Sequence, residues 1–125
     1  MKKEVISTKN APGAVGPYSQ GIKSGNMCFL SGQLPIDPVT GIMPETVEEQ
    51  TVKSLENVKA ILASQGRTLD SVVKTTVFLS DIADFAAMNK IYAEYFAEPY
   101  PARSCFAVKD LPKGAKVEIE VISID

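Results

Sequence analysis

The last quarter of the chain holds a guanidinium, a thiol and two carboxylates on consecutive strand-like segments. Arg103 and Cys105 are two residues apart in one segment, and Glu118 and Glu120 are two apart in the next. Because side chains alternate along a strand, the members of each pair share a face. An arginine can hold a carboxylate through two parallel hydrogen bonds, and a partly buried carboxylate can deprotonate water. The pattern predicts a site for a small carboxylic acid on a hairpin-like pair of strands.

These residues could also have purely structural roles, which their spacing in the sequence does not exclude. Arg103 could form an ion pair with Glu118 or Glu120 instead of binding a ligand. Cys105 could be a small buried hydrophobe rather than a reactive thiol. The sequence therefore leaves both interpretations open for this segment.

Composition narrows the classes of function. The 125 residues are 45% hydrophobic and 22% charged, which is typical of one globular domain covering residues 1–125. The net charge is −2 and no Lys/Arg cluster is present, so we expect no nucleic-acid partner. No apolar run approaches the roughly 20 residues of a membrane span, and no apolar segment follows residues 1–6 as in a signal peptide. These features predict a cytoplasmic protein with reduced thiols and no membrane partner.

The absence of histidine limits the chemistry. Without an imidazole there is no Ser-His or Cys-His nucleophile of the usual kind. A zinc site would have to be built from carboxylates and the two cysteines, Cys28 and Cys105. The glycines of residues 13–17 fail both the Walker and the Rossmann spacings. We therefore predict no metal and no cofactor, and chemistry confined to carboxylate, hydroxyl, thiol, guanidinium, backbone and water.

Two helices are expected to support these segments. The first is predicted over residues 47–65, because a Thr-x-x-Glu capping box opens it and Gly66 suits the position after it. The second is predicted over residues 82–96, with Asp81 as its N-cap. Each helix has one apolar stripe, which we interpret as core: Val52, Leu55, Val58 and Leu62 in the first, and Phe85, Met88, Tyr92 and Tyr95 in the second.

Strand patterns account for most of the remaining chain. A hairpin is predicted across residues 20–31 around a Ser-Gly-Asn turn, and the β-branched run 72–79 predicts a further strand. A short apolar start and the two closing segments complete the set. The order is three strands, a helix, a strand, a helix and two strands, which predicts an α+β fold with a mixed sheet.

The expected sheet is apolar on both faces. Both helices are one-sided, so the simplest packing places them on the same face of the sheet. In the last strand, three residues would meet the helices, namely Val117, Ile119 and Val121, and Ile122 and Ile124 would lie on the opposite face with the two glutamates. The strand at 72–79 would divide with Val73, Val77 and Leu79 on one face and Val72 and Phe78 on the other. No third layer is left in the chain, so we expect self-association through the open face and a site between subunits.

Five sequence blocks occur in order along the chain. They are GPYSQG at residues 16–21, SGQLP at 31–35, VKTTVFL at 73–79, PARSC at 101–105 and VEIE at 117–120. Together they resemble the RidA family of reactive intermediate (enamine/imine) deaminases, from near residue 10 to the C-terminus. The resemblance implies a chorismate-mutase-like α+β fold and a homotrimer whose sheets line a central barrel, with three clefts at the subunit interfaces.

The same resemblance implies an activity. Members of the RidA branch hydrolyse 2-aminoacrylate and 2-iminobutanoate to 2-oxo acids and ammonia without a cofactor. These imines come from pyridoxal-phosphate enzymes, so the implied link to those enzymes is metabolic and requires no complex. A small carboxylate-bearing imine is the expected substrate, and the deaminase branch is marked by an arginine at the position of Arg103.

Residue roles also follow from the resemblance. Arg103 would clamp the substrate carboxylate and Glu118 would orient and activate water, with Cys105 beside the clamp as a third catalytic position. Glu120 matches the acting carboxylate less well than Glu118. The other positions implied in substrate binding are Tyr18, from a neighbouring subunit, Ser31, Gly32, Asn89 and Phe85.

Two other functions remain open at the level of sequence. The same cleft could bind 2-oxo acids as a non-catalytic regulatory module, although a site for an anion alone gains nothing from a carboxylate such as Glu118. RNA cleavage or inhibition of translation has been attributed to some relatives, but the net charge of −2 and the absence of a basic patch argue against it. Deaminase activity is therefore the favoured prediction.

Overall fold

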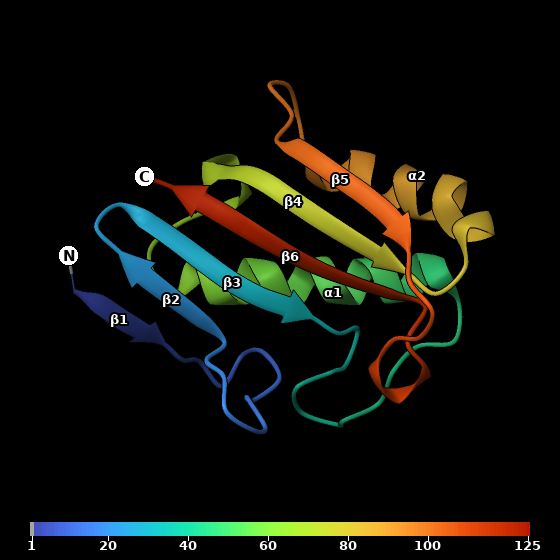
Figure 1. Cartoon of the computed structure of the whole chain (residues 1–125), viewed down its shortest axis with the longest axis horizontal. Coiled ribbons are helices and arrows are strands. Elements are labelled where there is room, and N and C mark those ends of the chain that lie inside the picture. The colour runs from blue at the N-terminus through green and yellow to red at the C-terminus, as the bar shows by residue number, and fades with distance from the viewer. Residues whose placement is uncertain (1) are drawn as a thin grey trace.

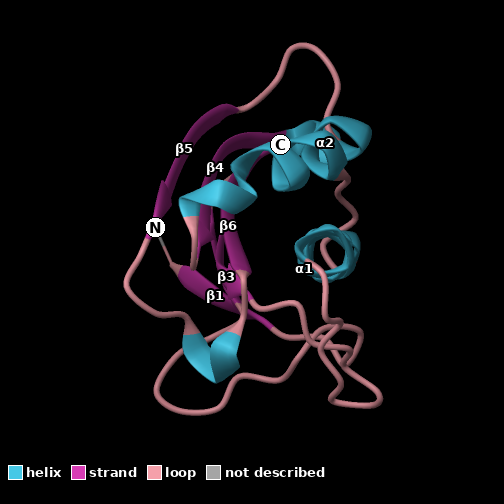
Figure 2. Ribbon diagram, turned by 90° about the vertical axis from the view of Figure 1, so that its right-hand side faces the viewer, coloured by secondary structure: helices cyan, strands magenta, loops and turns pink. Residues whose placement is uncertain are grey.

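The computed structural model describes residues 2–125 as a six-stranded mixed sheet with two α-helices on one face (Figures 1 and 2). The helices are α1 (Val47–Ala63) and α2 (Phe85–Tyr95), and three short 3-10 turns are η1 (Leu69–Ser71), η2 (Ile82–Asp84) and η3 (Pro112–Gly114). The strands are β1 (Lys3–Ile6), β2 (Gly21–Ser24), β3 (Met27–Gln33), β4 (Val72–Leu79), β5 (Ala102–Ala107) and β6 (Val117–Ile124). Their order in the sheet is β1-β2-β3-β6-β4-β5. The predicted α+β class and element order are confirmed, and no helix in this range is long and apolar enough to cross a membrane.

Helix α1 is bounded by the capping residues that predict it. The Thr46 hydroxyl accepts a hydrogen bond from the Glu49 N–H (3.1 Å), as in a capping box, and the Glu49 carboxylate accepts from the Thr46 hydroxyl (2.9 Å) rather than from its backbone N–H. At the other end Gly66 has a φ of +70°, and the Arg67 N–H donates to the Leu62 carbonyl at 3.0 Å. This Schellman arrangement ends the α-helix two residues before the expected position.

Helix α2 begins three residues later than predicted. Asp81 accepts a hydrogen bond from the Ala83 N–H (2.9 Å), but the turn that it caps is η2, which precedes the α-helix. On α2 itself Met88 and Tyr92 are buried against the sheet, whereas Phe85 is exposed. The centre of the predicted apolar stripe therefore lies in the core, whereas its first residue, Phe85, lies at the surface.

The core lies between the helices and the sheet. Along β6, Val117, Ile119 and Val121 are buried against the helices, as the alternation predicts. The helices contribute the buried side chains Leu55, Val58, Ile61, Leu62 and Met88. This packing makes β6 and its neighbours a rigid support for the side chains on their other face.

The predicted hairpin of the last two strands is wrong. Strands β5 and β6 do not pair with each other, because β4 lies between them, parallel to β5 and antiparallel to β6. The segment β4-α2-β5 is a strand–helix–strand unit, and such a crossover returns the chain parallel to its first strand. The connection from β5 then carries the chain past β4 to its other edge, which is visible in Figure 1.

The predicted division of faces is wrong at the start of β4. Val72 is buried on the helix side of the sheet together with Val77, whereas Val73 is exposed. The register with β6 shifts between Val72 and Lys74, so a β-bulge at Val73 inverts the alternation expected from the sequence.

Nothing in residues 2–125 covers the face of the sheet away from the helices. The rings of Phe78 and Phe106 meet edge to face on it, with centroids 5.4 Å apart. Three large apolar side chains here, Phe29, Phe106 and Ile124, are 40%, 46% and 40% exposed. An exposed group of this kind is a candidate interface, as the two-faced sequence pattern suggests.

Candidate active site

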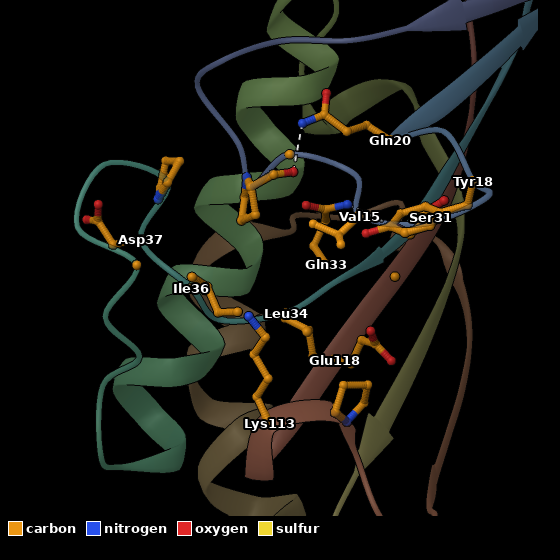
Figure 3. Close-up of a pocket in the computed structure, with 16 residues that line it drawn as sticks. Val15, Tyr18, Gln20, Ser31, Gln33, Leu34, Ile36, Asp37, Lys113 and Glu118 are labelled. Carbon is orange, nitrogen blue, oxygen red and sulfur yellow. Dashed lines mark hydrogen bonds between the residues drawn. The ribbon is translucent and has the colours of Figure 1, made fainter.

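A cavity of about 720 Å³ lies beside the end of β3 (Figure 3). Four of the predicted site residues line it, namely Tyr18, Ser31, Gly32 and Glu118. Cavities of this size are typical of small-molecule sites. The structure thus gathers residues from the loop before β2, from β3 and from β6 around one space.

A β-bulge shapes the wall formed by β3. The register with β6 shifts between Leu30 and Gln33, so β3 carries an extra residue at Ser31-Gly32. A Cβ added at Gly32 would lie 2.9 Å from the Glu118 Cδ and 3.0 Å from its Oε2. Only glycine therefore allows the β3 backbone to approach the Glu118 carboxyl so closely.

Gly32→Ala is expected to lower activity without unfolding the protein. The new methyl group would displace the end of the Glu118 side chain, which is flexible enough to move while the strands stay paired. A displacement of about 1 Å at a reacting group can cost roughly 100-fold in rate. Turnover and thermal melting measured on the same preparation check this, and unchanged turnover would contradict the proposed placement of the carboxyl.

The loop before β2 is braced by Gln20, a residue that sequence reasoning missed, and is joined to the β3 wall by Ser31. The Gln20 side chain donates to the Pro12 carbonyl (2.8 Å) and accepts from the Thr8 N–H (2.7 Å). The Ser31 hydroxyl donates to the Ser19 carbonyl (2.6 Å). These bonds hold the loop that carries the predicted site tyrosine. The only sequence signal was a glutamine next to a loop rich in proline and glycine.

The Glu118 carboxyl has an environment suited to a base. Burial raises its pKa above the ordinary value for glutamate, and the nearby negative charge of Glu120 raises the pKa further. A carboxylate with a raised pKa is a stronger base once ionised. Neither of the two ion pairs in residues 2–125 involves it. In the same range no group of three or more His, Cys, Asp or Glu side chains is placed to hold a metal.

Arg103 lies in a second cluster, formed by β5 and α2. Its Nη1 donates to the Asn89 Oδ1 at 2.6 Å, and its guanidinium carbon is 4.7 Å from the Tyr92 ring centre and 5.5 Å from that of Phe85. Both distances allow a cation–π interaction. The bond to Asn89 uses one of five guanidinium donors, and in the described part of the chain no carboxylate lies within 4 Å. The alternative of an ion pair with a β6 glutamate is therefore wrong within one chain.

Tyr92 is the residue of this cluster that the sequence did not identify as part of a site. The helical stripe predicts it as core, and it is buried, with its hydroxyl 2.8 Å from the Thr75 Oγ1. Its ring also forms the floor beneath Arg103. Tyr92 belongs to the apolar stripe that the sequence shows for this helix. Only the pairing of β5 with β4 shows that the Arg103 guanidinium lies over the Tyr92 ring.

Cys105 shares the face of Arg103, as the spacing predicts. Burial raises the pKa of its thiol above the ordinary value, and the positive charge of Arg103 offsets only part of that effect. The protonated thiol is therefore the favoured form near neutral pH. This argues for packing and weak polar contacts rather than for a thiolate nucleophile.

The two clusters lie on opposite faces of the sheet. Arg103 is in register with Thr75 of β4, whose side chain is buried beneath α2. Glu118 is in register with Phe78 of β4, three residues further on and therefore on the open face. Within one chain, the two residues expected to do the chemistry do not share a site.

Comparison with known proteins gives matches over nearly the whole chain. Residues 8–124 match the family described as Endoribonuclease L-PSP. A RutC family protein, y4sK, from Sinorhizobium fredii is 56% identical over 120 residues, which are 95% of each chain. The 2-iminobutanoate/2-iminopropanoate deaminase of Salmonella typhimurium is 49% identical over 124 residues, or 97% of each chain. The crystal structure of E. coli TdcF with bound serine is similar with a TM-score of 0.93 and 47% identity over 98% of each chain.

Proposed function

The chain belongs to the RidA family of reactive intermediate deaminases, and from that premise we propose that it hydrolyses small 2-enamine and 2-imino acids, such as 2-aminoacrylate and 2-iminobutanoate. The products are 2-oxo acids and ammonia. The observation that carries the proposal is a guanidinium with open donors together with a partly buried carboxyl of raised pKa. A relative named as a deaminase of such imines, and another relative with bound serine, support it.

The proposed reaction needs only water and proton transfer. The water oxygen bonds to the imine carbon while Glu118 takes one water proton, and the carbon–nitrogen bond then breaks. Glu118 passes that proton to the nitrogen, and the proton of the hydroxyl now on the carbon follows it as the bond breaks, so ammonia leaves with both water protons and the carbon retains a carbonyl group. An enamine first takes a proton on its methylene carbon to become the imine. The imine carbon is already electrophilic, so positioning and proton transfer supply the acceleration.

The remaining residues would orient the substrate. Arg103 would hold the substrate carboxylate with two parallel hydrogen bonds, a geometry that suits its planar fork. The Gly32 N–H and the Ser31 hydroxyl would contact substrate or water, and Tyr18 would close the cleft. Cys105, Asn89 and Phe85 would surround the clamp.

A cleft between subunits would bring the two clusters together. Because they lie on opposite faces of the sheet, one copy would supply the Arg103 cluster and the next copy the Glu118 cluster. A heterologous contact of this kind forms a ring when its rotation closes. We propose a homotrimer with three such clefts, in which the uncovered sheet faces line a central barrel. The exposed Phe29, Phe106 and Ile124 support this arrangement, since it would bury them.

The function is tested by a coupled assay. Threonine dehydratase acting on threonine supplies 2-iminobutanoate, and release of 2-oxobutanoate is followed with and without the protein. The proposal expects faster release, also after dialysis against EDTA. Tight binding of 2-oxobutanoate without acceleration would instead support the regulatory binding module, and cleavage of RNA without either would support the ribonuclease named in the family description.

The pH dependence is expected to report the interaction between the two β6 glutamates. Glu118 must be ionised to act, so kcat/KM should fall on the acid side at a pH above the ordinary glutamate pKa. Because the charge of Glu120 raises the pKa of Glu118, Glu120→Gln should lower that pKa and move the acid limb to lower pH. Glu48→Gln, on the exposed start of α1, removes the same charge and should leave the limb in place. An unmoved limb in Glu120→Gln would contradict Glu118 as the titrating base.

A further inference from the structure

The cavity that contains Glu118 continues past it to the η3 turn. Its far wall includes Leu34, Ile36 and Lys113, and Figure 3 shows the Lys113 side chain extending along that wall. A four-carbon imino acid has about seven non-hydrogen atoms, and at roughly 30 Å³ each, the share of a water molecule in the liquid, it would fill about 200 Å³. The cavity of about 720 Å³ leaves room for a longer substrate, even with Arg103 of a neighbouring subunit at one end.

The backbone of Lys113 is in an unusual conformation. It has φ of 59° and ψ of 21°, and it is the one non-glycine residue with positive φ in residues 2–125. This left-handed region is disfavoured for a residue with a β-carbon, and glycine or asparagine adopts it more readily. Such exceptions gather at ligand sites. A lysine here goes against the local preference, which points to a use for its side chain.

The charge of Lys113 is not neutralised within the described part of the chain. The two ion pairs in residues 2–125 join other residues. Asp37, an acidic residue of the same wall, is already engaged. Its carboxylate accepts hydrogen bonds from the N–H groups of Val39 (2.8 Å) and Thr40 (3.0 Å) and pairs with the Lys53 ammonium at 3.3 Å. Lys113 therefore offers a free cation at the far end of the cavity, beside the aliphatic Leu34 and Ile36.

We infer that Lys113 is a second anion-binding point, so that the site accepts 2-imino acids with a terminal carboxylate as well as short aliphatic ones. This rests on the proposed function for the identity of the ligand. Arg103 would hold the carboxylate next to the imine, and the carbon chain would lie along Leu34 and Ile36. The terminal carboxylate would then reach the Lys113 ammonium. The hydrolysis itself is unchanged.

Two five-carbon acids that differ only in the terminal group test the inference. Calorimetric titration with 2-oxoglutarate and 2-oxopentanoate is expected to show about 2- to 5-fold tighter binding of 2-oxoglutarate, the range of an exposed ion pair. The preference should disappear in Lys113→Asn, because asparagine tolerates the left-handed backbone but carries no charge. It should return in Lys113→Arg, which restores the cation.

Lys116→Gln is the matched control, since it removes the same charge from an exposed side chain three residues away and should keep the preference. Equal affinity of the wild-type protein for the two acids, no binding of either, or a preference that survives in Lys113→Asn, would each overturn the inference. The coupled threonine assay on the same preparations separates the two proposals. Turnover without the preference refutes the second anion-binding point alone, and the preference without turnover refutes the deaminase while retaining that point.

Discussion

Arg103→Ala is expected to abolish imine hydrolysis and the binding of 2-oxobutanoate while the protein stays folded. The half-buried guanidinium donates to Asn89 and stacks on Tyr92, and losing these contacts should cost about 1–2 kcal/mol of unfolding free energy. That corresponds to a fall of a few degrees in melting temperature. The substitution would also remove both of the hydrogen bonds that we propose for the substrate carboxylate. Activity should therefore fall far more than stability.

Two further substitutions separate a clamp from a structural cation. Arg103→Lys keeps the charge but loses the planar fork, so it should also fail in the coupled assay. Arg67 provides the contrast, because it is only 7% exposed and its Nη1 donates to the Ser123 hydroxyl at 2.8 Å. Arg67→Ala should lower the melting temperature and leave the specific activity of the folded fraction intact.

The same measurements would show whether Arg103 is instead a structural residue. Arg103→Ala would have to melt much earlier than the wild-type protein, with its specific activity preserved in the folded fraction. That result would make Arg103 a structural residue and refute the clamp. Melting curves and rates must therefore come from the same preparations.

Features decided by neighbouring residues could be predicted from the sequence. The capping box at Thr46 and the left-handed Gly66 set the ends of α1 through bonds that span only a few residues. The alternation along β6 identified its buried face, because one side of that strand meets the helices. The turn at Gly25 joins β2 to β3 in the expected place. Each of these depends on local chemistry.

Features decided by strand register could not be predicted. The sequence suggested that the consecutive strands β5 and β6 pair, but β4 lies between them. The bulge at Val73 arises from the register in which β4 pairs with β6. Tyr92 becomes part of a site only because β5 lies beside β4. The resemblance named eight site residues, but not their division between the two faces. The structure places Tyr18, Ser31, Gly32 and Glu118 in the cavity, and Phe85, Asn89, Arg103 and Cys105 in the other cluster.

Glu118→Gln is the second change with a large expected effect. Glutamine has nearly the same shape but cannot take a proton from water, so turnover should fall by about 100- to 10,000-fold while 2-oxobutanoate still binds. Burial disfavours the ionised form of Glu118, so the neutral amide should keep or raise the melting temperature near neutral pH. Glu120→Gln, one position along the same face, should retain most of the rate at neutral pH. Near-normal turnover in Glu118→Gln would assign the base to another group.

Mixing the two inactive variants tests whether the site is divided between subunits. In a ring of three, each cleft would take Arg103 from one copy and Glu118 from the next. About three quarters of trimers assembled at random from equal amounts of Arg103→Ala and Glu118→Gln would be mixed, and each would hold one intact cleft of its three. Refolding the variants together should thus restore about one quarter of wild-type activity, and mixing them without subunit exchange should restore none.

The control for this experiment uses two variants with defects in the same half of the cleft. Gly32→Ala and Glu118→Gln both alter the carboxylate side of the cavity, so their mixed trimers should contain no intact cleft and show no recovery. Light scattering and native mass spectrometry would establish that mixed trimers had formed. If they form from Arg103→Ala and Glu118→Gln without restoring activity, the two residues do not meet across an interface. Arg103 and Glu118, which lie on opposite faces of the sheet, would then have separate roles.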